Sequence, residues 1–306
     1  MNEPIQSVLE GLDSIILGKH REVRLALASL LAGGHLLIED VPGTGKTTLA
    51  LALGRVLGLH QRRVQFTVDV LPSDITGSSI YRQSDQAFEF HPGPIFSQIL
   101  LADEINRAMP KTQSALLEAM EENAVSQDGL TYPLPSPFFV IATQNPRHHS
   151  GTYPLPESQL DRFLMTVQMG YPSADAELVL LTSESTRQKV LDQAALCTPE
   201  QLLGWQAEVR AIKVASAMAD YVLRLVRQSR VDALFEVGLS PRGGLALMAA
   251  SRAWAFLQGR DFVTPEDVQA VFAAVCQHRL RFRSSEDHAE LHHAITDFLN
   301  RVDVVA

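Results

Sequence analysis

The chain has 306 residues, of which 46% are hydrophobic and 20% charged, and its formal net charge is −9 at pH 7. This length is sufficient for two compact domains, and the negative charge argues against nucleic-acid binding through an overall basic surface. No apolar run approaches the roughly 20 residues that span a bilayer, and the first residues lack the basic and apolar regions of a secretory signal. The two cysteines, Cys197 and Cys276, have no metal-binding or disulfide spacing. We therefore expect buried thiols in a cytoplasmic protein that is not inserted into a membrane.

Apolar residues recur at a spacing of three or four between Val8 and Leu31. This spacing predicts one or two amphipathic helices over residues 5–31. Gly18 followed by Lys19 interrupts the pattern, so we expect the break between the two helices at that point.

Five short apolar segments then alternate with helical patterns. These segments are His35–Glu39, Val64–Asp69, Ile99–Asp103, Phe138–Thr143 and Leu164–Met169. Strands that alternate with helices predict a parallel sheet covered by helices on both faces. Asp40, Asp103 and Asn145 lie at the ends of three of these segments, which is where such sheets bind ligands. The sequence therefore predicts an α/β core with a site at the carboxyl edge of its sheet.

Two stretches interrupt this alternation, at about residues 72–94 and 123–137. The first is rich in Gly, Pro and Phe, and the second contains Asp128-Gly129, a common hairpin turn, between apolar residues. Both stretches are therefore predicted to be hairpins inserted into the α/β core.

The chain changes character after Tyr171 and reads as helical to its end. Three of the predicted helices begin with Ser or Thr followed by Pro, residues that are favoured at the N-cap and at the first helical position. These pairs are Thr198-Pro199, Ser240-Pro241 and Thr264-Pro265. We therefore predict an α/β domain over residues 1–171 and a helical domain over residues 172–306.

The segment after the first predicted strand has the composition of a phosphate-binding loop. It runs from Pro42 through Gly43, Thr44, Gly45, Lys46 and Thr47 to Thr48, where a helix is predicted. Strand, glycine-rich loop and helix form the context that such a loop requires. The general pattern has glycine where this chain has Asp40, so the match to that pattern is imperfect.

Each part of this loop suits a nucleoside triphosphate. Gly43 and Gly45 let backbone N–H groups turn toward phosphate oxygens, and the following helix adds positive charge at its N-terminus. Lys46 can reach the β- and γ-phosphates, and the Thr47 hydroxyl can bind Mg²⁺. By itself the loop predicts binding of Mg·ATP or Mg·GTP.

Two further predicted strands end in groups that complete a hydrolytic site. Asp103, at the tip of one strand, can hold the metal directly or through water, and Glu104 can accept a proton from an attacking water. Asn145 follows another strand, where its amide can orient that water. These residues predict that the bound nucleotide is hydrolysed.

This arrangement resembles AAA+ ATPases over nearly the whole chain. Gly43–Thr47 is similar to Walker A, Ile99–Glu104 to Walker B and Asn145 to sensor 1. Four segments narrow the resemblance to the MoxR family, in which an acid at the position of Asp40 is familiar. These segments are Leu37–Lys46, Asp103–Ala108, Lys111–Glu121 and Pro154–Phe163.

The resemblance implies a fold and further site residues. The implied fold is a P-loop AAA+ core, with a five-stranded parallel sheet flanked by helices, followed by a small all-α lid domain. Arg162 stands where the family carries its arginine finger, which reaches the ATP of a neighbouring subunit. Arg242 stands where the family carries sensor 2, which we expect to contact the γ-phosphate within the same subunit. Gly18 and Lys19 lie in a segment that resembles the one along the adenine.

The resemblance also implies cofactors and partners. They are ATP/ADP and Mg²⁺, a homo-oligomer in the form of a hexameric ring, and a protein client, often with a von Willebrand factor A-domain partner. The implied function is an ATPase that drives chaperone-like remodelling, maturation or metal-cofactor insertion of that client. The two predicted hairpins resemble inserts that ring ATPases of this clade often aim at a central pore.

Two other functions stay open at this point. One is a nucleic-acid motor, because the clade includes helicase-like relatives, although the net charge of −9 makes nucleic acid an unlikely partner. The other is a non-hydrolysing ATP switch or scaffold, against which the intact Lys46, Asp103, Glu104 and Asn145 argue.

Four residues near these motifs have two interpretations each. Arg107 and Lys111 fit either an intersubunit contact near ATP or solvated side chains. Phe88 and Phe90 fit either an exposed contact with a partner or packing beneath the first hairpin.

Two histidine pairs, His148-His149 and His292-His293, could suggest a metal site. Neither pair has an evident third ligand, so we expect no metal at either.

Overall fold

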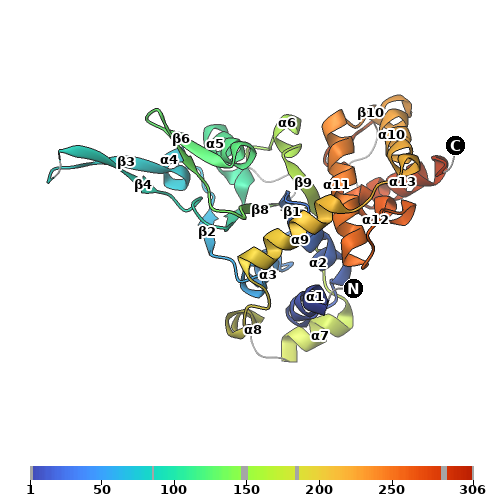
Figure 1. The fold of residues 1–306 in the computed structure, drawn as a ribbon, viewed down its shortest axis with the longest axis horizontal. Coiled ribbons are helices and arrows are strands. Elements are labelled where there is room, and N and C mark those ends of the chain that lie inside the picture. The colour runs from blue at the N-terminus through green and yellow to red at the C-terminus, as the bar shows by residue number, and fades with distance from the viewer. Residues whose placement is uncertain (1–2, 85, 146–150, 183–185, 284–287, 305–306) are drawn as a thin grey trace.

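The computed structural model describes residues 3–84, 86–145, 151–182, 186–283 and 288–304 (Figure 1). The helices are α1 Glu3–Ile15, α2 His20–Leu31, α3 Lys46–Val56, α4 Pro72–Thr76, α5 Pro110–Glu122, α6 Glu157–Leu160, α7 Ala174–Thr182, α8 Thr186–Asp192, α9 Pro199–Ala211, α10 Ser216–Val231, α11 Pro241–Leu257, α12 Pro265–Cys276 and α13 His288–Arg301. The strands are β1 His35–Glu39, β2 Gln61–Gln65, β3 Gly77–Arg82, β4 Ala87–Pro92, β5 Ile99–Asp103, β6 Ala124–Gln127, β7 Leu130–Pro133, β8 Phe139–Gln144, β9 Phe163–Val167, β10 Phe235–Val237 and β11 Arg281–Phe282.

A five-stranded parallel sheet forms the centre of the fold, with the strand order β2-β5-β8-β1-β9. The predicted five-stranded parallel sheet with flanking helices is thereby confirmed. Because all of these strands run in the same direction, their carboxyl ends lie along one edge of the sheet and their amino ends along the other. We call these the carboxyl edge and the amino edge.

Strand β2 differs from its predicted position. The apolar pattern indicated Val64–Asp69, whereas the strand is Gln61–Gln65. β2 lies at an end of the sheet, beside β5, and an edge strand tolerates polar residues. Arg62 and Arg63 are exposed on it, so apolar periodicity could not mark where the strand begins.

The two faces of the sheet belong to separate hydrophobic cores. Leu36 and Ile38 of β1 join the core that contains the apolar residues of α1, α2 and α3. Leu37, between them, joins the core that contains the apolar residues of α5. Successive side chains of a strand point to opposite faces, and burial on both faces explains why the inner strands read as nearly continuous apolar runs.

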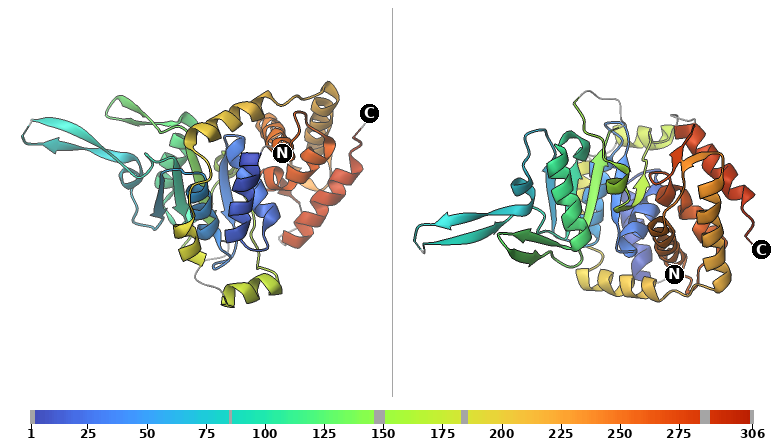
Figure 2. Two further views of the ribbon diagram at one scale, coloured as in Figure 1. Left: turned by 60° about the horizontal axis from the view of Figure 1, so that its bottom comes forward. Right: turned by 90° about the horizontal axis from the view of Figure 1, so that it is seen from above.

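Two antiparallel hairpins, β3–β4 and β6–β7, project from the same side of the molecule (Figures 1 and 2). Phe90 of β4 stacks on Tyr132 of β7 with ring centroids 4.0 Å apart, and the Ser79 hydroxyl donates to a carboxylate oxygen of Asp128 at 2.5 Å. The hairpins therefore pack against each other. Phe88 is 73% exposed, so Phe90 packs between the hairpins while Phe88 faces solvent.

The residues after β9 form helices α7 to α13 and one two-stranded ribbon. Two predicted N-caps are confirmed, because the hydroxyls of Thr198 and Ser240 accept hydrogen bonds from backbone N–H groups of the helices that they precede. The ribbon pairs β10 with β11, and the sequence did not indicate it. Its strands are two or three residues long and join through Phe235 and Phe282, whose rings meet edge to face at 5.1 Å.

These C-terminal helices contact the sheet and its helices at several points. α8 lies on α3, where Arg55 donates to the carbonyls of Leu191 and Gln193. α11 packs on α2, and α12 packs on β9. A domain boundary near residue 171 stays a prediction. Among the described helices, none is both long and apolar enough to cross a bilayer.

Both cysteines are buried, as predicted. Burial raises the pKa of the Cys197 thiol to about 11 and that of Cys276 to about 12. At neutral pH both therefore behave as small apolar side chains.

Candidate active site

The strand order brings three of the predicted motifs together at the carboxyl edge. β5, β8 and β1 are consecutive in the sheet. Asp103 ends β5, Asn145 follows β8, and the loop from Asp40 to Gly45 connects β1 to α3. Residues that are far apart in the chain therefore converge on one short stretch of the sheet edge.

Glycine is required in the phosphate-binding loop for its backbone conformation. Gly43 has φ 87° and Gly45 has φ 88°, a left-handed region that residues with a side chain adopt at a cost. Gly45 is the N-cap of α3, so Lys46, Thr47 and Thr48 form the first turn of the helix. The loop thus leads directly into a helix N-terminus, where unpaired backbone N–H groups favour an anion.

Asp40 connects this loop to the segment that follows the carboxyl end of β9. One carboxylate oxygen accepts the N–H of Val41 at 2.7 Å, and the other accepts the N–H of Gly170. Glycine could make neither bond, so Asp40 has a structural reason to replace the glycine of the general pattern. Within the loop, the Thr44 hydroxyl donates to the Val41 carbonyl at 3.1 Å.

The Lys46 ammonium is enclosed by oxygen atoms. It donates to the carbonyls of Asp40 and Val41, the latter at 3.3 Å, and to Oδ1 of Asn145 at 2.8 Å. Burial lowers the pKa of Lys46, and the negative charges of Asp40, Asp103 and Glu104 oppose that shift. These acids therefore favour a charged ammonium, which is the form that binds phosphate.

The Thr47 hydroxyl and the Asp103 carboxylate face each other, with Thr47 Oγ1 3.4 Å from Asp103 Oδ2. Hydroxyl and carboxylate oxygens are the hard ligands that Mg²⁺ prefers, so this pair fits the predicted metal. Asp103 is 6% exposed, and Oδ1 accepts the Thr143 hydroxyl at 2.5 Å. Oδ2 also accepts two N–H groups of Arg63, at 2.6 and 3.2 Å.

Glu104 has an uncommon backbone conformation, with φ 57° and ψ 49°. Left-handed backbone at a residue other than glycine is strained and is often found at functional sites. Its N–H donates to the Thr143 hydroxyl at 2.9 Å, and Oε1 accepts the Asn145 amide at 3.2 Å. Oε2 accepts Arg107 at 2.9 Å and Gln65 at 3.0 Å.

Three residues that make these contacts were not selected by the sequence analysis. Thr143 bonds to both Asp103 and Glu104, Arg63 pairs with Asp103, and Gln65 bonds to Glu104. Thr143 could have been found, because it precedes Asn145 by two positions and its side chain shares a face of the strand. Arg63 and Gln65 lie on β2, whose predicted position was wrong.

The turn between α1 and α2 lies near the same edge. Gly18 has φ 71°, and the adjacent Lys19 ammonium donates to the Tyr171 carbonyl at 2.8 Å. Tyr171 follows Gly170, which Asp40 holds. This chain of contacts links the predicted adenine segment to the phosphate-binding loop.

The two predicted arginines lie elsewhere, at the amino edge. Arg162 directly precedes β9 and pairs with Glu121 near the end of α5, at 2.9 Å. Arg242 approaches the same carboxylate at 3.4 Å and a carboxylate oxygen of Asp161 at 3.9 Å. We call Glu121, Asp161, Arg162 and Arg242 the arginine cluster.

This placement corrects one expectation, that Arg242 contacts the γ-phosphate within its own subunit. Arg242 shares Glu121 with Arg162, at the amino edge, whereas Lys46 follows the carboxyl end of β1. A five-residue strand separates these edges by about 13 Å or more, at roughly 3.3 Å per residue. In this structure Arg242 therefore groups with the predicted finger and away from its own phosphate-binding loop.

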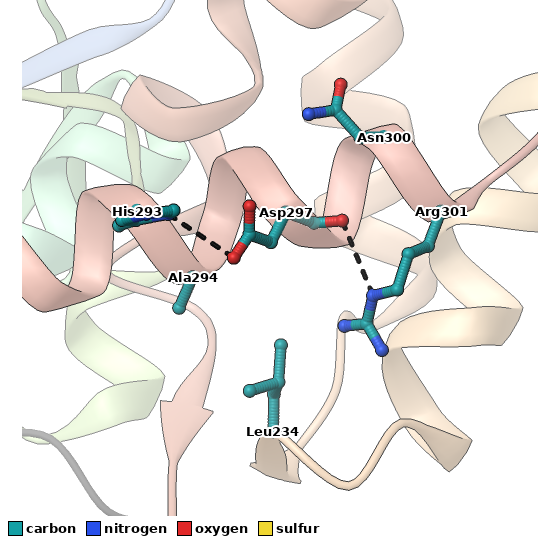
Figure 3. Close-up of a pocket in the computed structure, with 6 residues that line it drawn as sticks. All are labelled: Leu234, His293, Ala294, Asp297, Asn300 and Arg301. Carbon is teal, nitrogen blue, oxygen red and sulfur yellow. Dashed lines mark hydrogen bonds and ion pairs between the residues drawn. The ribbon is translucent and has the colours of Figure 1, made fainter.

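The structure describes only part of the two histidine pairs. His148-His149 lies outside the described residues. His293 lines a surface hollow of about 620 Å³ on α13 and pairs with Asp297 at 3.3 Å (Figure 3). Arg301, on the same helix, donates to the Asp297 carbonyl. Within the part of the chain that the structure describes, no group of three or more His, Cys, Asp or Glu side chains could hold a metal ion.

Comparisons with known proteins identify the class to which the chain belongs. A family model described as "ATPase family associated with various cellular activities (AAA)" matches residues 35–165, and an AAA lid domain model matches residues 227–297. The fold and the loop therefore define an AAA ATPase with its lid.

Individual relatives show to which family of AAA ATPases the chain belongs. YeaC of Bacillus subtilis, an uncharacterized protein, is 46% identical over 89% of this chain and 85% of its own length. Chaperone MoxR1 of Mycobacterium tuberculosis is 43% identical over 87% of this chain and 72% of its own length. The crystal structure of a candidate ATPase from Cytophaga hutchinsonii superposes with a TM-score of 0.86 at 34% identity, and covers 98% of this chain and 94% of that one. The chain belongs to the MoxR family of AAA+ ATPases.

Proposed function

We propose that this protein hydrolyses Mg·ATP in a homo-oligomeric ring, in which the arginine cluster of one subunit completes the ATP site of the next. One observation carries the proposal: the phosphate-binding loop with its acids and the two arginines lie at opposite edges of one sheet. A single chain cannot bring them to the same phosphate. A neighbour that presents its amino edge to the carboxyl edge of the next chain can.

Each residue at the carboxyl edge has a proposed role. The loop from Pro42 to Thr48 binds the phosphates through backbone N–H groups and the Lys46 ammonium, while Gly18 and Lys19 lie along the adenine. Glu104 accepts the proton of the attacking water, and the Asn145 amide orients that water. Thr47 and Asp103 hold Mg²⁺, which when bound neutralises charge on the phosphate oxygens.

The two arginines of the neighbouring subunit act on the charge that develops during transfer. Arg162 and Arg242 donate to the γ-phosphoryl oxygens, and a finger of this kind is worth about 10³–10⁵ in rate in other phosphate-loop enzymes. Residues 1–171 and 172–306 form the nucleotide-binding domain and the lid in this proposal. Their relative movement delivers work to a protein client, in line with the name of the chaperone relative.

We further propose a hexameric ring in the cytoplasm, and a client that is remodelled, matured or loaded with a metal cofactor. A von Willebrand factor A-domain protein is the partner to test first. Trapping Glu104→Gln on ATP and identifying the co-purifying proteins tests this part. Recovery of no partner, although the trapped ring forms, would contradict it.

Mixed subunits test the shared site directly. A Glu104→Gln subunit lacks the base of its own site but still gives intact arginines to its neighbour. An Arg162→Ala subunit keeps the base of its own site but gives its neighbour no arginine finger. Each variant alone should be nearly inactive. Random mixing in equal amounts places an intact site beside an intact arginine at about a quarter of the contacts in a ring, so activity should return to about that fraction of wild type. A mixture as inactive as its components would contradict the shared site.

A second mixture decides between the two locations of Arg242. If both arginines act on the neighbouring site, each site needs both of them from one subunit. Neither Arg162→Ala nor Arg242→Ala has both, so a mixture of the two should stay inactive. If Arg242 acted within its own subunit, this mixture would regain activity. We expect no rescue, while Arg242→Ala mixed with Glu104→Gln should recover.

A further inference from the structure

A buried arginine of the lid, Arg279, forms hydrogen bonds with the turn that carries Arg162. The Arg279 side chain is 4% exposed, and its Nε donates to a carboxylate oxygen of Asp161 at 2.6 Å. Its Nη2 donates to the carbonyls of Phe163 at 2.7 Å and Asp161 at 3.1 Å, and Nη1 donates to the Leu164 carbonyl at 3.1 Å. Arg279 therefore holds the backbone on both sides of Arg162.

Residues that follow α12 bind the backbone of β9 and so connect this strand to the lid. β9 is an edge strand of the sheet, so part of its backbone needs partners from outside the sheet. The segment after α12 supplies them: Gln277 donates to the Thr166 carbonyl at 3.2 Å, and the His278 ring nitrogen Nε2 lies 3.1 Å from the Phe163 carbonyl. Arg279 extends this row of contacts to the turn before the strand.

Arginine is suited to this position in a way that lysine is not. Its planar guanidinium presents five N–H donors in a fixed fork, whereas lysine has three donors around a single nitrogen. Nε and both Nη groups of Arg279 each donate to atoms of residues 161–164. Asp161 is 23% exposed and Arg279 is buried, so removing the Asp161 charge would leave the guanidinium buried without its carboxylate partner.

Asp161 also pairs with Arg242, the second arginine of the cluster. Oδ1 of Asp161 accepts Arg279, while Oδ2 lies 3.9 Å from Nε of Arg242. Arg242 and Arg162 also share the Glu121 carboxylate. The lid residue Arg279 and the two arginines of the cluster are thus joined by one short series of ion pairs.

We propose that Arg279 is a positioning residue, which fixes the turn at residues 161–163 so that Arg162 projects toward the ATP of the neighbouring subunit. This inference rests on the proposed function. Arg279 touches no substrate, and it acts through Arg162. Displacement of a catalytic group by about 1 Å can cost about 100-fold in rate, so the loss of this constraint should be measurable in kcat.

The main test is Arg279→Lys in the full chain. We expect an assembled ring with kcat about 100-fold lower and with KM for ATP within about twofold of wild type, because the damaged subunit keeps its own phosphate-binding loop. Mixing Arg279→Lys with Glu104→Gln should recover activity as Arg162→Ala does. Mixing it with Arg162→Ala should not, since both variants damage the donated arginine.

Arg260→Lys is the matched control for a general loss of lid stability. Arg260 also belongs to the lid and makes a bidentate pair with the buried Asp267, with both N–O distances 2.6 Å. Its described hydrogen bonds go to Thr264 and Asp267, and none goes to the turn at residues 161–163. Arg260→Lys should lower the melting temperature while kcat stays near wild type. Asp161→Asn is a second test variant should Arg279→Lys fail to assemble, and it should give the same kcat loss and the same pattern of rescue.

The outcomes separate the inference from the proposed function. Wild-type kcat in Arg279→Lys, or a loss that Glu104→Gln cannot rescue although it rescues Arg162→Ala, overturns the positioning role. If Glu104→Gln fails to rescue Arg162→Ala itself, the shared active site is wrong, and the positioning role is wrong with it.

Discussion

The two edges of the central sheet carry charged groups in different arrangements. At the carboxyl edge, Lys46, Asp103 and Glu104 come from loops and strand ends that the sheet itself brings together. At the amino edge, Arg162 comes from the turn before β9, whereas Arg242 comes from the start of α11 in the lid. One edge is assembled within the α/β core, and the other depends on how the lid is attached to it.

In the proposed function, this difference explains why one chain carries only part of an active site. In the same proposal, the groups at the carboxyl edge bind phosphate, hold a metal and accept a proton. The amino edge has cations that are held by Glu121 and Asp161. Variants at the carboxyl edge should therefore damage the chain's own site, and variants at the amino edge should damage that of a neighbour.

Lys46→Ala should have the largest effect. Without the ammonium that faces the phosphates, we expect ATP binding to be lost and hydrolysis to fall by about 10³-fold or more. Nucleotide binding by fluorescence and phosphate release would measure both. Arg162→Ala is the contrast at the other edge, because it should retain ATP binding. If Lys46→Ala bound ATP as wild type does, the phosphate-binding loop would be misassigned.

Glu104→Gln should separate binding from hydrolysis at the carboxyl edge. The amide keeps the shape of the side chain but cannot accept the proton, so we expect unchanged ATP affinity and a loss of about 10²–10⁴ in kcat. Single-turnover phosphate release, with nucleotide affinity measured in parallel, provides the check. Turnover at the wild-type rate would remove Glu104 from the role of base.

His35 at the amino end of β1 should make stability depend on pH. Its Nδ1 accepts the Val140 N–H at 3.0 Å and its Nε2 faces the Met120 carbonyl at 3.2 Å, an arrangement that needs the neutral ring. Burial lowers the pKa of His35 from 6.5 to about 4. The unfolded chain therefore binds the proton first as the pH falls, so stability is full above about pH 6.5 and is lost between pH 6.5 and 4. The loss should reach about 3 kcal/mol.

Urea unfolding at a series of pH values would measure this change in the free energy of unfolding. His35→Leu should make the profile shallower between pH 6.5 and 4, with lower stability at pH 7. Burial also lowers the pKa of His278, so part of the slope should stay. His60→Gln is the control, since His60 is exposed and its replacement should leave the profile unchanged. An unchanged profile in His35→Leu would show that another group titrates there.

Arg63→Met should have the smallest effect, on the metal. Arg63 is 51% exposed and pairs with Asp103, so it competes with a metal ion for that carboxylate. Because the Arg63 end of the pair is solvated, we take the pair to be worth about 1 kcal/mol at most. We therefore expect half-maximal ATPase activity at an Mg²⁺ concentration up to about fivefold lower. A higher Mg²⁺ requirement would mean that Arg63 assists metal binding.

Much of the carboxyl edge could be predicted from the sequence alone. The phosphate-binding loop, Asp103 with Glu104, and the N-cap at Thr198 are defined by residues that are adjacent or a few positions apart. Local hydrogen bonds and backbone conformations determine such features, for example the left-handed φ of Gly43. The strands β1 and β5 were predicted with their observed bounds because each contains three or four consecutive apolar residues next to polar ones.

Only the tertiary structure decided the rest. β2 is polar because it lies at the end of the sheet, so no apolar pattern revealed that Arg63 and Gln65 reach Asp103 and Glu104. The sequence indicated Arg242 as a motif residue, but its location depends on how α11 packs against the core, 80 residues along the chain from Arg162. A sequence gives the chemistry of each group from its neighbours in the chain. Which groups share a site depends on the packing of strands and lid, and that packing separates Lys46 from both arginines.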